Sequence, residues 1–99
     1  MDKIYKILTK SEYNKFKEEK VFHGSELDLK DGYIHLSFEQ QTKRTLEKFF
    51  AGQSDLYILS FSQDLPHLKI ESLKGPGSEE FPHLYGSLRW NDVLEVSKI

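Results

Sequence analysis

Two short segments of the chain each place one histidine among aromatic, glycine and hydroxyl side chains. They are residues 32–38 (GYIHLSF) and 81–86 (FPHLYG), and their histidines are His35 and His83. A neutral imidazole has one hydrogen-bond donor and one acceptor and changes charge near physiological pH, so it can bind a sugar hydroxyl, act as a general base or ligate a metal. We therefore expect any site to include these two segments.

Residues 32–38 have the alternation of a strand, which predicts that Tyr33, His35 and Ser37 share one face. Ser37 also begins a Ser-x-x-Gln capping box with Gln40, so the start of a helix accounts for its hydroxyl. A helix N-terminus beside His35 would offer free backbone donors to an anionic or polar ligand. Without a ligand, His35 would instead satisfy a carbonyl of a neighbouring loop.

In residues 81–86, alternation predicts that Phe81, His83 and Tyr85 lie on one side. Gly86 permits a close approach or an unusual backbone angle. An aromatic pair beside a histidine can form a stacking wall for a planar ring, or the aromatics can simply complete the core. Pro82 indicates an edge strand or an extended loop, because proline cannot donate to a sheet ladder.

Glu71 lies on the polar face of an alternating segment, residues 67–72, together with Lys69. Its carboxylate can stabilise positive charge that develops on a sugar, although such a strand normally carries solvated charges. The four histidines are not paired at three- or four-residue spacing and the chain has no cysteine, so we predict no metal site.

Length and composition predict a single domain over residues 1–99, since 99 residues form one core. The net charge is −2 and the lysines alternate with acidic residues, which indicates no nucleic-acid partner. The absence of cysteine excludes disulfides and a thiol mechanism. There is no signal-peptide pattern or membrane-spanning run, so we expect a soluble, cytoplasmic protein without membrane association.

Hydrophobic periodicity predicts both helices and strands along the chain, in an order that does not alternate regularly. We expect a helix over 10–20, opened by a capping box of Thr9 and Glu12, and a second helix that follows Ser37 and ends at Gly52. Residues 21–32 are expected to form a loop around a short strand near Phe22, and 74–80 a turn. Further strands are expected over 4–8, 55–61, 67–72 and 92–99, with 55–61 central. The irregular order favours a compact α+β domain with a mainly antiparallel sheet and two helices.

The two histidine motifs, taken with residues 49–52 (FFAG), 55–59 (DLYIL) and 70–71 (IE), resemble the small bacterial family known as domain of unknown function 952. This resemblance covers nearly the whole chain and implies a split-sheet or half-barrel fold similar to that of ADP-ribosyltransferases, which hold NAD between two small antiparallel sheets. It also implies that His35 binds a ribose hydroxyl, that Tyr85 or Phe81 stacks on nicotinamide, and that Glu71 is the late catalytic acid. One departure is Gly86-Ser87-Leu88, where family members often have Gly-Pro-Leu.

The resulting hypothesis is an NAD- or nucleotide-binding cleft with glycosyl or phosphoryl transfer. Its expected catalytic residues are His35, His83 and Glu71, and its expected ligand-binding residues are Tyr33, Ser37, Gln41, Phe81, Tyr85 and Gly86. Two alternatives remain. One is a protein-interaction module with an aromatic edge near Phe81 and Trp90, and the other is a degenerate enzyme that keeps only the fold, which a wide separation of Glu71 from His35 would favour.

Overall fold

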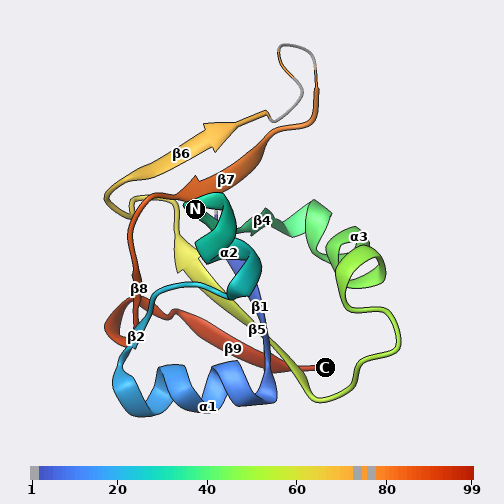
Figure 1. Ribbon diagram of the computed structural model, residues 1–99, viewed down its shortest axis with the longest axis vertical. Coiled ribbons are helices and arrows are strands. Elements are labelled where there is room, and N and C mark those ends of the chain that lie inside the picture. The colour runs from blue at the N-terminus through green and yellow to red at the C-terminus, as the bar shows by residue number, and fades with distance from the viewer. Residues whose placement is uncertain (1–2, 73–74, 76–77) are drawn as a thin grey trace.

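The computed structural model describes residues 3–72, 75 and 78–99 and shows a single α+β domain whose paired strands are all antiparallel (Figure 1). A four-stranded sheet has the order β4 (Ser37–Phe38), β1 (Lys3–Thr9), β5 (Leu56–Ser62) and β9 (Glu95–Lys98). A three-stranded sheet has the order β3 (Ile34–His35), β7 (Phe81–Leu84) and β6 (Leu68–Glu71). The remaining pair is β2 (Val21–Phe22) with β8 (Leu88–Arg89). The predicted antiparallel α+β class is confirmed.

The predicted first helix is present as α1 (Lys10–Glu19), and its capping box forms as expected. Glu12 N donates to Thr9 Oγ1 over 3.2 Å, and Thr9 N donates to Glu12 Oε1 over 3.0 Å. Because each side chain satisfies a backbone donor that the helix leaves free, β1 passes directly into α1. Phe16 is the buried residue of this helix and anchors it to the core.

The predicted loop over 21–32 is wrong in part, because it contains a further helix, α2 (Glu26–Asp31), besides the short strand near Phe22. Ser25 and Asp28 form its capping box. Six residues are too few to show helical periodicity, and the buried residue of α2 is the charged Asp28, which is why the hydrophobic pattern gave no signal. The part of the chain that the structure describes therefore has three α-helices in place of the expected two, with a short 3₁₀ turn at Trp90–Asp92.

The strand expected over 32–38 is divided between two sheets. Its first part is β3 and its second part is β4, so only Tyr33 and His35 stay together as predicted. Ser37 is not the N-cap: α3 (Glu39–Phe49) begins after Phe38, whose N–H donates to the Gln41 side chain over 3.0 Å. The Ser37 hydroxyl lies 3.2 Å from that of Thr45 on α3.

Strand β7 is the middle strand of its sheet, so the prediction that Pro82 marks an edge is wrong. The carbonyl of Pro82 accepts from Leu36 N over 3.1 Å, on the side of β3. The N and O atoms of one strand residue point to the same neighbouring strand, so the Pro82 nitrogen also points toward β3 and not toward β6. On that side, β3 pairs with His83 and Leu84 of β7. The ladder from β7 to β6 is therefore intact.

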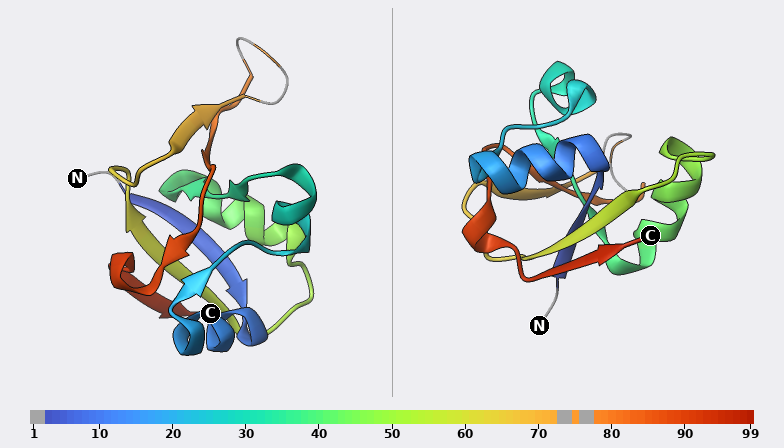
Figure 2. Two further views of the ribbon diagram at one scale, coloured as in Figure 1. Left: turned by 60° about the vertical axis from the view of Figure 1, so that its left-hand side comes forward. Right: turned by 90° about the horizontal axis from the view of Figure 1, so that it is seen from below.

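The core lies where one face of the four-stranded sheet meets α1 and the two smaller sheets (Figure 2). The predicted central strand is confirmed, since β5 lies between β1 and β9. Helix α3 contacts β1 and β4 and packs on the other face, where Thr45 meets Ser37. The turn expected over 74–80 lies in part outside the described residues. The fully buried apolar side chains among the described residues are Ile4, Leu8, Phe16, Ile34, Leu59, Phe61, Pro82, Leu84 and Leu88.

Candidate functional site

His35 and His83, from the two motifs, are paired residues of neighbouring strands. The register of β3 and β7 sets them opposite each other, and their ring centroids lie 5.8 Å apart at 71°. Tyr33 joins the rings, with its centroid 4.1 Å from that of His83 in a stacked arrangement and 4.7 Å from that of His35. Antiparallel pairing thus brings together two segments that are almost fifty residues apart in sequence. We call Tyr33, His35, Glu71, His83 and Tyr85 the histidine cluster.

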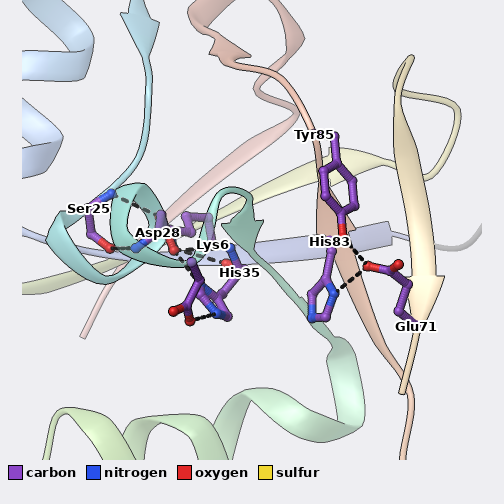
Figure 3. Close-up of polar contacts among 8 residues, drawn as sticks. Lys6, Ser25, Asp28, His35, Glu71, His83 and Tyr85 are labelled. Atoms are coloured by element: carbon purple, nitrogen blue, oxygen red, sulfur yellow. Dashed lines mark hydrogen bonds and ion pairs between the residues drawn. The ribbon is translucent and has the colours of Figure 1, made fainter. Parts of the chain in front are cut away.

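Asp28 of α2 holds His35 in place (Figure 3). Its Oδ1 accepts from the His35 backbone N–H over 3.1 Å and lies 2.6 Å from His35 Nδ1. Its Oδ2 accepts from Lys6 Nζ over 2.9 Å and from Ser25 N over 2.9 Å. Lys6 Nζ also donates to the His35 carbonyl over 2.9 Å. A buried carboxylate and a buried ammonium therefore fix both the backbone and the ring of His35.

The electrostatics of Asp28 follow from these contacts. The residue is only 2% exposed, and burial by itself would raise the pKa of its carboxyl. The hydrogen bond from His35 and the nearby Lys6 ammonium outweigh burial and hold that pKa well below its ordinary value. Asp28 is consequently a permanent anion at physiological pH. His35 Nε2 faces a second carboxylate, Asp31 Oδ2, at 3.1 Å.

Glu71 of β6 holds His83 in a similar way (Figure 3). Its Oε1 lies 2.9 Å from His83 Nδ1 and accepts from the Tyr85 hydroxyl over 2.7 Å. The bonds from Tyr85 and from His83 lower the pKa of the Glu71 carboxyl, and the same contact raises the pKa of Tyr85 to about 12. Glu71 is thus connected to His35 through the ring of His83, whose centroid lies 5.8 Å from that of His35.

A groove of about 900 Å³ runs beside the histidines, between α2 and α3. Its walls include Leu27 and Asp28 of α2 and Arg44, Lys48 and Phe49 of α3, and residues of β1 also line it. We call it the α2–α3 groove. This volume lies within the range of small-molecule sites. Of the expected site residues, the groove is lined by His35, Ser37, Phe81 and His83.

The other expected site residues lie outside the groove lining. Tyr33, Glu71 and Tyr85 stand behind the histidines in the cluster. Gln41 is buried and donates to the Glu79 carboxylate and to the Glu80 carbonyl, over 3.0 and 2.8 Å. Gly86 has no positive φ, and a Cβ there would meet its nearest neighbour, His67, at an ordinary 3.9 Å. The close approach expected at Gly86 is therefore wrong.

Several residues that line the groove were not predicted from the sequence. Asp28 had a usable signal, the Ser-x-x-Asp capping box that it forms with Ser25. Lys6 had none, because an alternating strand normally turns its lysines to solvent, whereas this one is buried against Asp28. Leu27 and Phe49 are exposed apolar side chains on opposite walls of the groove, which only the packing of α2 and α3 reveals.

The alternative aromatic edge is divided in the structure. Trp90 packs on the core, T-shaped against Phe16 with a centroid distance of 5.2 Å, whereas Phe81 lines the α2–α3 groove. Within the described residues, no group of three or more histidine, aspartate or glutamate side chains is arranged to hold a metal ion. Over the same part of the chain, none of the helices has the length and apolar character needed to cross a membrane.

Fold and site together define a small antiparallel α+β domain with a groove lined by two carboxylate-paired histidines. The family described as "Protein of unknown function (DUF952)" matches residues 7–96, and the chain belongs to it. Protein CC0527 from Caulobacter crescentus is similar: its X-ray crystal structure shows 38% sequence identity and a TM-score of 0.88, with 96% of this chain and 83% of that chain covered. The solution NMR structure of CC0527 has a TM-score of 0.83 at 38% identity, covering 97% of this chain and 83% of that chain. No curated protein matches the chain.

Proposed function

We propose that the α2–α3 groove binds a nucleotide of the NAD type and that the histidine cluster supports glycosyl transfer from it. One observation carries the proposal: His35 and His83, each paired with a carboxylate, line the same 900 Å³ groove. Carboxylate pairing orients an imidazole and fixes its tautomer, which is how proteins prepare a histidine to bind or to transfer a proton.

The groove walls provide contacts for the other parts of a nucleotide. Phe49 is 54% exposed and Leu27 is 45% exposed, and together they offer apolar surface to a base. Lys48 supplies positive charge for phosphate groups, and Arg44, which is paired with Glu79, lies on the same wall. His35 supplies hydrogen bonds to ribose hydroxyls. The division into small antiparallel sheets is in keeping with the resemblance to ADP-ribosyltransferases.

The charge around the histidines favours glycosyl over phosphoryl transfer. Three carboxylates contact the two rings, Asp28, Asp31 and Glu71, against one buried ammonium, that of Lys6. Negative surroundings stabilise the positive charge that a sugar develops as its glycosidic bond breaks. The same surroundings oppose the accumulation of negative charge on a transferring phosphoryl group.

Binding is tested by titrating the ¹⁵N-labelled chain with NAD, ADP-ribose and AMP and by calorimetry. We expect chemical-shift changes around His35 and His83 and along α2 and α3. Phe49→Ala should weaken binding about ten-fold, since stacking of a base is worth about 1–3 kcal/mol. Leu29→Ala is the matched control, because Leu29 is 65% exposed on α2 and does not line the groove. If none of the three ligands changed the spectrum around the two histidines, the proposal would be overturned.

A further inference from the structure

We propose that His83 is the general base of this transfer, that Glu71 is its positioning residue, and that the acceptor is a hydroxyl group, either water or an alcohol. The inference rests on the proposed function and deepens it. It assigns different work to two histidines that are alike in sequence. The assignment follows from which ring nitrogens already have partners.

Both ring nitrogens of His35 face carboxylates. Nδ1 is hydrogen-bonded to Asp28 Oδ1 over 2.6 Å, and Nε2 lies 3.1 Å from Asp31 Oδ2 in an ion-pair contact. An ionised carboxylate only accepts hydrogen bonds, so Nδ1 donates to Asp28, and the Asp31 carboxylate stands beside Nε2. His35 is therefore suited to binding a ligand and not to accepting a proton from it.

His83 differs from His35 at its Nε2 atom. Its Nδ1 lies 2.9 Å from Glu71 Oε1, and among the described residues no side chain or backbone group is hydrogen-bonded to Nε2. The carboxylate keeps the proton on Nδ1 and leaves a lone pair on Nε2. The ring is only 1% exposed and lies under Tyr33, yet it lines the groove, so its contact with the groove is confined to an edge. This is the arrangement of a base that meets one positioned group and is shielded from bulk water.

Glu71 acts through His83. Its Oε1 accepts from His83 and from Tyr85, and two donors on one oxygen hold the carboxylate in a single orientation. Glu71 does not line the groove, so it has no contact with a ligand bound there. Its expected role as the acid that stabilises the sugar is replaced in this proposal by the orientation of the base.

The step balances without a further reactant. The C–N glycosidic bond of the NAD-type ligand breaks, and its electron pair goes to the pyridinium nitrogen, which leaves as neutral nicotinamide. The acceptor oxygen forms a bond to the anomeric carbon, and its proton moves to Nε2 of His83. An amine acceptor is disfavoured, because the carboxylates that line the groove favour its ammonium form, which has no free electron pair; they are those of Glu12, Glu26, Asp28 and Glu79.

The protonation pattern is tested by long-range ¹H–¹⁵N NMR on the full chain at neutral pH. We expect the His83 signals to show a protonated Nδ1 and a bare Nε2. In Glu71→Gln the two tautomers should mix, which is a spectroscopic change that a merely structural role for Glu71 would not produce. A wild-type His83 ring with its proton on Nε2 would overturn the inference.

The chemistry is tested by nicotinamide release from NAD, with water or methanol as acceptor. His83→Asn keeps a donor toward Glu71 but has no base, and it should lower the rate by about 10²–10⁴-fold with NAD affinity retained. His83→Gln is a second variant in case the first is poorly folded, and His23→Gln is the matched control on an exposed histidine that should not change the rate. If NAD binds but the wild type releases no nicotinamide, or both His83 variants are as fast as the wild type, the inference fails and the proposed binding stands. If NAD does not bind, both fail.

Discussion

Replacing Asp28 with asparagine should destabilise the domain more than any other single change in α2. The substitution leaves the Lys6 ammonium, 7% exposed, without its counter-charge and removes a carboxylate that accepts four hydrogen bonds. Breaking a buried ion pair by removing one partner costs about 3–5 kcal/mol. That loss is a large part of the roughly 5–15 kcal/mol by which domains are stable.

Urea unfolding at pH 7, followed by tryptophan fluorescence, measures this loss. With a denaturant slope of about 1–3 kcal/mol/M, the midpoint should fall by at least about 1 M. Asp31→Asn is the matched control, since the Asp31 side chain is 37% exposed and forms an ion pair with His35, and it should cost less than about 1 kcal/mol.

The double variant Lys6→Met/Asp28→Leu tests the cause. Replacing both charges of a buried pair with apolar groups is often neutral or stabilising, so the double variant should recover most of the loss. A cost below about 1 kcal/mol for Asp28→Asn, or a double variant no more stable than the single one, would refute this account of how α2 is held.

Three further predictions follow from the same structure. The pKa of Asp28 is held below its ordinary value of 3.8 in the folded state, so its stabilising contribution is present above pH 3.8 and is lost as the pH falls below that value. The urea midpoint of the wild type should therefore drop more steeply between pH 4 and 2 than that of Asp28→Asn. Parallel curves for the two proteins would contradict this. Gly24→Ala should lower the free energy of unfolding by about 1–3 kcal/mol, since φ is +128° and the new Cβ would lie 2.8 Å from Asp28 Cβ. Gly52→Ala, where φ is +79° and the space is open, should cost about 1 kcal/mol in the same thermal unfolding assay. Equal costs would show that the new Cβ at residue 24 does not press on Asp28. In a spectrophotometric pH titration, one tyrosine should ionise near pH 12 and disappear in Tyr85→Phe, and the persistence of that step would show that Glu71 does not hold the Tyr85 hydroxyl.

Local patterns were sufficient for most of the fold. Thr9 and Glu12 predicted the start of α1, and the apolar run of β5 predicted a central strand, because capping and strand hydrophobicity depend on neighbours in sequence. The same reasoning failed at α2, which is held by the contacts of buried Asp28 with Lys6 and His35 and not by an apolar face. It failed at Pro82 because the Pro82 nitrogen points toward β3, which is a short strand that pairs with His83 and Leu84, so the missing N–H leaves β7 between two neighbours.

For the site, the sequence by itself determined which side chains carry chemistry: two histidines, a tyrosine before the first, and an acid in an alternating strand. Strand periodicity also placed Tyr33 beside His35, since that relation is local. Only the tertiary structure decided that the two histidines face each other, that Asp28 pairs with one and Glu71 with the other, and that Lys6 is buried among them. The reason is physical: register across strands and the partners of a buried charge depend on packing between distant segments, which the local sequence does not encode.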